Sequence, residues 1–383
     1  MFNLRPIPLG SIPDIAPVFV VGAGRSGTTP LQLALNMHPE LGVYGETQAF
    51  FVHQKFGAET GEISSRRLLE YWRVAVSGCC PYSDLLDSQD MQYQLAYAPS
   101  YAHILNLVMG AIAAREGKSR WGEKSPAHIF RLREIRSCFP NARIIHIVRD
   151  PRAVVCSTIK AFHRGEFTDW NIYSAAKYWR RCLEVHARQI AAPTDGYMLV
   201  RYEDFVMRPE ATLSVISSFL GLKFAEGMLN AHRVASKYIR PGRSGGMPAM
   251  HTLTQTPLDP GRTDAWKRSL SHTQTKLIEQ VAGNEMRTLG YEPARKEYSP
   301  PQMRVSLFLS RWAVGEGRRI ALTKVQAPYW ALRRGIDSRT TRVKSPEPPS
   351  FVTSPLNPET SGKQPSIVGT ATESTGTVHP SGA

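Results

Sequence analysis

Short apolar runs alternate with amphipathic stretches over most of the chain. The apolar runs that predict buried strands lie at residues 17–22, 142–148 and 197–202, with a further short strand just before residue 46. The stretches with helical spacing lie at residues 28–37, 170–191 and 273–289. Strands that alternate with helices predict an α/β fold with a doubly wound parallel sheet flanked by helices.

The pattern changes after about residue 292 and divides the chain. We predict a short N-terminal extension, a main α/β domain, a basic amphipathic extension, and a tail rich in Ser, Thr, Pro and Gly. These four parts cover residues 1–14, 15–295, 296–344 and 345–383. The composition of the last part is typical of a disordered segment.

Charge and composition narrow the function classes. The net charge is +15, which suits an anionic ligand, nucleic acid or a membrane surface. Residues 304–344 hold ten basic and two acidic residues, so eight of the fifteen net charges lie outside the main domain. We therefore expect no nucleic-acid partner for that domain.

Targeting and metal-binding patterns are lacking in the sequence. It has no apolar run of roughly 18 residues, and residues 1–17 have no apolar core of a signal peptide. The five cysteines form no C-x-x-C pair. We expect reduced thiols, a cytoplasmic location and no metal site.

A glycine-rich loop follows the first predicted strand and opens a helix. It contains Gly22, Gly24, Arg25, Ser26, Gly27, Thr28 and Thr29. Backbone N–H groups at such a junction bind phosphate-like anions. Gly22 and Gly27 have the spacing of a nucleoside-triphosphate loop, but Thr28 stands where that loop has its lysine. The loop therefore suits a phosphate-like group better than a metal-bound triphosphate.

A second motif follows the strand at residues 142–148. Arg149 ends this strand, Pro151 suits the first turn of a helix, and Ser157 lies eight residues after Arg149. An arginine at a strand end and a serine on the adjoining helix can converge on one phosphate.

Together the two motifs resemble those of sulfotransferases that use 3′-phosphoadenosine 5′-phosphosulfate (PAPS). The resemblance covers about residues 15–291 and implies a P-loop-type fold with helical insertions. It implies that residues 24–29 bind the 5′-phosphosulfate, that Arg149 and Ser157 bind the 3′-phosphate, and that adenosine 3′,5′-bisphosphate is the product. No metal is expected, because a sulfuryl group carries less charge than a terminal phosphoryl group.

The resemblance also implies a catalytic set. Glu46 follows Arg25 by 21 residues, as does the base of the tyrosylprotein sulfotransferase branch. That branch has arginines just after its glutamate, whereas this chain has residues 48–51 (Gln-Ala-Phe-Phe), which puts an acidic-peptide acceptor in doubt. Lys124 matches a lysine that, with Arg25, stabilises the bridging oxygen of the leaving group.

Further residues are implied for the cofactor pocket or offer alternatives. Tyr202 matches a Tyr-Glu segment of the nucleotide pocket, and Arg262 and Lys267 belong to a late loop expected to close over the 3′-phosphate and adenine. Related small-molecule sulfotransferases use a histidine base, for which this chain offers His103, His128 and His146.

The implied function is in-line sulfuryl transfer to a hydroxyl or amine acceptor, which could be a sugar, lipid, phenol or peptide. Two alternatives stay open: a small-molecule kinase on the same fold, and a non-catalytic protein that binds membrane or nucleic acid through its basic charge. The sequence does not give the oligomeric state.

Residues 304–344 generate a hypothesis about membranes. Aromatic and aliphatic residues such as Phe308 and Trp312 are interleaved with arginines, so this segment is expected to lie peripherally on anionic lipid. The alternative is a flexible basic extension. In co-sedimentation with anionic vesicles, the full chain should bind more strongly than a 1–295 truncation; equal binding would refute membrane contact by this segment.

Overall fold

The computed structural model describes nine stretches of the chain. These are residues 16–51, 71–73, 75–76, 83–96, 98, 100–163, 171–192, 195–239 and 252–294. The predicted N-terminal extension, basic extension and C-terminal tail lie outside the described residues, so their boundaries stay predictions.

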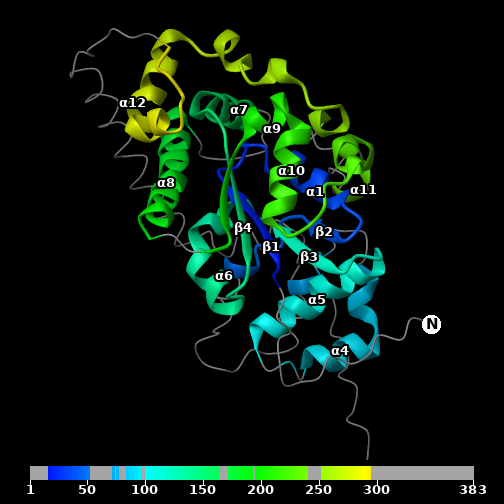
Figure 1. Ribbon diagram of the computed structural model, residues 1–383. Helices are drawn as coiled ribbons and strands as arrows, with labels where there is room; N and C mark the ends of the chain where they lie inside the picture. Colours follow the sequence, from blue (N-terminus) through cyan, green and yellow to red (C-terminus); the bar gives the residue numbers. More distant parts are fainter. Residues whose placement is uncertain are drawn as a thin grey trace, which may run out of the picture. The chain divides into compact units, whose positions relative to one another are not determined.

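Five parallel strands form the centre of the described structure. They are β1 (Val18–Gly22), β2 (Leu41–Tyr44), β3 (Arg120–Lys124), β4 (Arg143–Val148) and β5 (Tyr197–Arg201). Their order across the sheet is β2-β3-β1-β4-β5, and every neighbouring pair is parallel. This confirms the predicted parallel α/β sheet (Figure 1).

Helices cover both faces of the sheet in the described part of the chain. They are α1 (Thr28–Asn36), α4 (Gln89–Ala96), α5 (Tyr101–Arg115), α6 (Leu132–Cys138), α7 (Pro151–His163), α8 (Ile172–Ala191), α9 (Tyr202–Met207), α10 (Pro209–Phe219), α11 (Ala235–Tyr238) and α12 (His272–Thr288). Short 3₁₀ helices are η1 (Ser83–Asp87), η2 (Pro126–Arg131), η3 (Glu226–Val234), η4 (Thr252–Gln255), η5 (Pro260–Arg262) and η6 (Ala265–Arg268). None of these helices is long and apolar enough to cross a membrane.

Alternating side chains of the central strand enter two separate cores. Phe19 and Val21 pack with residues of α5, α6 and α8 on one face. Val18 and Val20 pack with residues of α1, α9 and α10 on the other face. All four side chains are fully buried, which is why β1 reads as an uninterrupted apolar run. Figure 1 shows α6 and α8 on one side of the strands and α1 and α10 on the other.

The sequence pattern failed to identify β3. This strand contains Gly122, Glu123 and Lys124, so it presents neither an apolar run nor an alternation. Gly122 is required because a Cβ there would come within 2.7 Å of the carbonyl oxygen of Val18 in the neighbouring strand. Glu123 and Lys124 are buried by groups far away in the sequence.

A buried histidine lies on the α8 side of the sheet. The Nδ1 atom of His146 in β4 is 2.7 Å from the Tyr197 hydroxyl, which is also 3.1 Å from Nδ1 of His186. Burial, and secondarily the charge of His186, lowers the pKa of His146 to about 3. The fold therefore favours the neutral imidazole.

Stability should depend on pH through His146. The unfolded chain takes up a proton near pH 6.5 whereas the folded chain resists it down to about pH 3, so stability is lost as the pH falls between these values. The contribution is up to about 1.4 kcal/mol per pH unit. Urea unfolding at pH 7, 6 and 5 should show a shallower decline for His146→Gln than for wild type. The exposed His272, changed to Gln, is the control and should leave the decline unaltered.

Candidate active site

The carboxyl ends of the five strands carry the chemically important side chains. The glycine-rich loop follows β1, Glu46 follows β2, Lys124 ends β3, and Arg149 and Tyr202 directly follow β4 and β5. Parallel strands bring these ends to one edge, which is where open α/β sheets bind ligands. Segments far apart in the sequence thereby meet at one edge of the sheet.

The loop after β1 has a backbone shape that depends on glycine at two positions. Gly22 and Gly27 have φ values of 142° and 97°, in the region that favours glycine. A Cβ on Gly27 would lie 2.3 Å from the ring of Tyr202, and one on Gly22 would lie 2.4 Å from the carbonyl oxygen of Ile147. Arg25 also has a positive φ of 72°, which is uncommon for a side-chain-bearing residue and is often found at functional sites.

One polar group of this loop lacks the partner expected of a buried group. Ser26 is fully buried, and its Oγ atom has no hydrogen-bond partner among the described residues. Buried polar atoms are normally satisfied, so an unpaired hydroxyl beside the N-terminus of α1 fits an anionic ligand. Gly24 has no atom within 4 Å of where its Cβ would be, so the loop is open on that side.

The two predicted phosphate-binding motifs meet directly. Nε of Arg25 donates a hydrogen bond of 3.1 Å to Oγ of Ser157 on α7. Arg149 donates to the carbonyl oxygens of Arg25, at 3.5 Å, and Arg262, at 2.8 Å. Its guanidinium carbon lies 4.3 Å from the centre of the Tyr202 ring. Nε of Arg149 is buried without a hydrogen-bond partner in the described part of the chain.

A cavity of about 300 Å³ lies between these motifs. Of the predicted residues, those that line it are Arg25, Gly27, Thr28, Thr29, Arg149, Ser157, Tyr202 and Arg262. Residues that sequence reasoning did not assign to the site also line it, including Cys156, Lys160, Leu253 and Trp266. The cavity thus combines several cationic and hydroxyl side chains with the faces of two aromatic residues.

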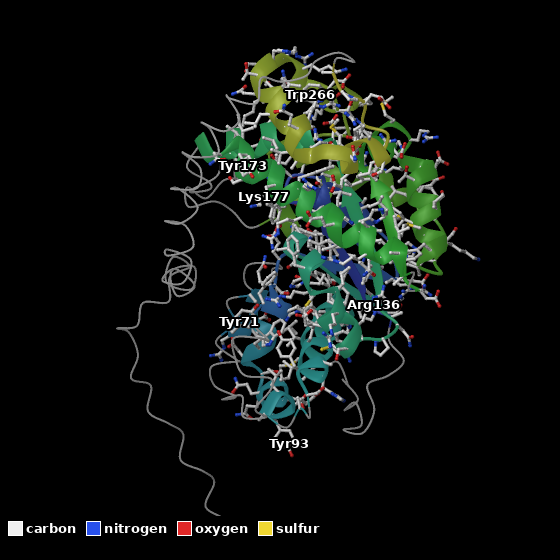
Figure 2. The ribbon with its side chains drawn as sticks, turned by 90° about the vertical axis from the view of Figure 1, so that its left-hand side faces the viewer. Tyr71, Tyr93, Arg136, Tyr173, Lys177 and Trp266 are labelled. Atoms are coloured by element: carbon white, nitrogen blue, oxygen red, sulfur yellow. The ribbon has the colours of Figure 1, made fainter. Side chains whose placement is uncertain are left out.

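Lys160 and Trp266 could have been found in the sequence. Lys160 lies three residues after Ser157 on α7, hence on the same helix face, and its Nζ donates to Ser269 at 2.8 Å. Trp266, which is labelled in Figure 2, belongs to the same late loop as Arg262 and Lys267. It packs on Ala153 and Cys156 of α7. Helical spacing from Ser157 is the signal that points to Lys160.

The two cations of the late loop are placed differently. The guanidinium of Arg262 bonds within its own loop, to the carbonyl of Leu253 at 3.0 Å and the hydroxyl of Thr256 at 2.9 Å. Lys267 pairs with Asp264 at 2.8 Å and lines a second cavity of about 680 Å³. Lys267 is not among the residues that line the 300 Å³ cavity.

Two of the three predicted catalytic residues, Glu46 and Lys124, form an ion pair. Nζ of Lys124 lies 2.7 Å from Oε1 of Glu46, although the residues are 78 positions apart. The Lys124 side chain is 4% exposed and that of Glu46 is 45% exposed. The carboxylate is therefore accessible to solvent, whereas the ammonium is almost fully enclosed by the protein.

The three alternative histidines occupy other settings. His103 bonds to Ser100 at the start of α5, His128 is buried beside Glu123, and His146 is buried against the sheet. No group of three or more His, Cys, Asp or Glu in the described stretches could hold a metal ion.

Comparisons with known proteins identify the family. A model of the sulfotransferase family matches residues 17–226. Protein-tyrosine sulfotransferase 2 of Gallus gallus is 27% identical over 298 residues, covering 72% of this chain and 69% of that protein. An omega-hydroxy-beta-dihydromenaquinone-9 sulfotransferase of Mycobacterium tuberculosis (strain CDC 1551 / Oshkosh) is 36% identical over 111 residues, covering 26% of this chain and 28% of that protein.

A solved structure supports the fold. The sulfotransferase domain from the curacin biosynthetic pathway is 19% identical, with a TM-score of 0.52, and the match covers 73% of this chain and 98% of that one. The family match spans more than half of the chain and includes both phosphate-binding motifs and the Glu46–Lys124 pair. This chain therefore belongs to the sulfotransferase family, as a PAPS-dependent enzyme that resembles the protein-tyrosine sulfotransferase branch.

Proposed function

We propose that the chain transfers a sulfuryl group from PAPS to a hydroxyl or amine acceptor by in-line displacement. The observation that carries this proposal is the contact of Arg25 with Ser157, which joins the two anion-binding motifs in one cavity. The donor substrate has an anionic group at each end of its ribose. A cavity with cations contributed by two separate motifs is complementary to such a molecule.

The loop after β1 would hold the 5′-phosphosulfate. Residues 24–29 offer backbone N–H groups at the start of α1, the unpaired hydroxyl of Ser26 and the guanidinium of Arg25. Thr28 replaces the lysine of a triphosphate loop, which favours a sulfuryl donor over a metal-bound triphosphate.

The second motif would hold the 3′-phosphate. Arg149 and Ser157 are the primary ligands, and Lys160 adds a cation beside them. The ring of Tyr202 orders Arg149 by stacking, and the backbone of Arg262 receives a hydrogen bond from it. Lys267 would reach the 3′-phosphate only after a movement of the late loop toward the cavity, because its ammonium pairs with Asp264.

Glu46 and Lys124 would perform the chemistry with Arg25. Glu46 accepts the proton of the acceptor hydroxyl while the new oxygen–sulfur bond forms. Lys124 and Arg25 donate to the bridging oxygen as the old sulfur–oxygen bond breaks and adenosine 3′,5′-bisphosphate leaves. The 2.7 Å ion pair holds the Glu46 carboxylate beside the Lys124 ammonium before substrates arrive.

The acceptor class follows from this base and from the relatives. Relatives are named for tyrosine and for an omega-hydroxy quinone derivative, both of which offer a hydroxyl. A carboxylate base of this kind suits a hydroxyl that loses its proton during transfer. A sugar, lipid, phenol or peptide hydroxyl would satisfy the same requirement.

Bisphosphate binding should require Arg149. Calorimetric titration of the wild type with adenosine 3′,5′-bisphosphate should show binding, and Arg149→Ala should weaken it about 10- to 100-fold, the value of one charged hydrogen-bonded contact. The exposed Arg208, changed to Ala, should have no effect. Tighter binding of ATP–Mg²⁺ than of bisphosphate, or no bisphosphate binding by folded wild type, would favour the kinase alternative or a non-enzymatic role.

Loss of the Glu46 carboxylate should affect turnover but not donor binding. Glu46→Gln should slow consumption of radiolabelled PAPS by roughly 100-fold or more, as expected when a general base is removed. Bisphosphate affinity should stay within about twofold, because Glu46 does not line the donor cavity. The exposed Glu40 in the same segment, changed to Gln, is the matched control. A Glu46→Gln variant with wild-type turnover would remove Glu46 from the mechanism.

A further inference from the structure

A buried polar cluster lies directly behind the Glu46–Lys124 ion pair. Its members are Thr47, Glu123, Ser125 and His128, each with at most 1% of its surface exposed. Ionised carboxylates are rarely buried to this degree unless several groups compensate their charge. Burial of the Glu123 carboxylate therefore costs desolvation free energy, which hydrogen bonds and charges from its partners must offset.

Glu123 bonds to the residues that immediately follow the catalytic pair. Its Oε1 atom accepts hydrogen bonds from the Thr47 amide, at 2.9 Å, and the Thr47 hydroxyl, at 2.8 Å. The same oxygen accepts the hydroxyl of Ser125. Thr47 follows Glu46 and Ser125 follows Lys124 in the sequence, so one carboxylate oxygen connects both catalytic segments.

The turn after Glu46 depends on this cluster for its shape. Gln48 has a φ of 57°, in the left-handed region that a glutamine seldom adopts. Its amide donates to Oγ of Ser125 at 3.2 Å. The amide of Ala49 donates to Oγ1 of Thr47 at 3.2 Å. The strained turn is thus held by hydroxyls that are themselves oriented by Glu123.

His128 extends the same support. Its Nε2 atom accepts the amide of Phe50 at 3.3 Å, and its Nδ1 atom lies 2.9 Å from Oε2 of Glu123. An accepting Nε2 places the ring proton on Nδ1, facing the carboxylate. On the outer side, the hydroxyl of Tyr71 (labelled in Figure 2) donates to the carbonyl of Thr47.

The electrostatics show that Glu123 keeps its charge. Burial by itself raises the pKa of Glu123, but the nearby Nδ1 atom of His128, with hydrogen bonds from Ser125 and Thr47, lowers it overall. An ionised carboxylate forms stronger bonds to amides and hydroxyls than a neutral group does. The cluster therefore holds its donors firmly although it is closed to solvent.

We propose that Glu123, supported by His128, is a positioning residue that fixes the Glu46 segment against the Lys124 segment and so aligns the base with the leaving-group cation. This proposal rests on the proposed sulfuryl transfer. Glu123 does not touch the donor cavity, so its contribution is to geometry alone. Small displacements of a catalytic group are costly in rate, because in-line transfer needs aligned reactants.

The test compares Glu123→Ala and Glu123→Gln with wild type. Three quantities are measured: consumption of radiolabelled PAPS with water as acceptor, affinity for adenosine 3′,5′-bisphosphate, and hydrogen exchange of the amides of residues 41–51. Glu123→Ala should slow turnover by roughly 10- to 100-fold, as for other supporting residues, and speed exchange in residues 47–50. Bisphosphate affinity should stay within about twofold. Glu123→Gln keeps an acceptor for Thr47 and Ser125 and should recover much of the rate.

Glu116→Ala is the matched control. The Glu116 side chain is also only 3% exposed, and it bonds to Lys237, Tyr44 and Tyr238 rather than to Thr47 or Ser125, the residues that directly follow Glu46 and Lys124. It should lose stability without the selective loss of turnover. An equal loss in Glu116→Ala, or unchanged turnover and exchange in Glu123→Ala, would overturn the positioning role alone. Wild type that binds no bisphosphate would instead overturn the proposed function, and this inference with it.

Discussion

The parallel sheet is buried on both faces, and this constraint determines where polar chemistry can occur. Phe19 and Val21 enter one core while Val18 and Val20 enter the other, so the central strand has no free face. Polar groups must then collect where the strands end, and the parallel arrangement brings all five carboxyl ends to the same edge. The loop after β1 with Arg25, Arg149 after β4 and the ion pair all lie at such strand ends.

Close packing at this edge links the parts of the donor site to each other. Gly27 permits the Tyr202 ring to approach the loop, and that ring in turn stacks on Arg149. Arg149 bonds to the backbone of both Arg25 and Arg262, so it ties the first loop to the late one. Several cations held this close repel one another, although Arg262 also pairs with Asp259 at 3.3 Å. The proposed anionic donor would offset this repulsion.

The ion pair and the cluster behind it show a second use of buried charge. The Lys124 side chain is 4% exposed and that of Glu46 is 45% exposed, so the carboxylate is the more accessible member of the pair. Glu123 spans the backbone segments that carry them. A buried charge of this kind contributes little net stability, because its desolvation offsets the attraction to its partners, but it strongly favours one arrangement of the chain.

The fold class and the two predicted anion-binding motifs can be recognised from the amino-acid sequence. The runs at β1 and β4 are apolar because both faces of those strands are covered, and Gly22, Gly27, Arg149 and Ser157 stand at fixed local spacings.

Other features depend on contacts between elements that are distant in the sequence, and the tertiary structure is needed to see them. It showed that β3 is a strand despite Gly122, Glu123 and Lys124, since their burial comes from segments distant in sequence. It also placed Lys160 in the donor cavity and Lys267 beside a different one. Local pattern records which residues share an element, whereas contacts between elements depend on how the chain packs. The hydrogen bond from Thr47, the residue after Glu46, to Glu123 is such a contact.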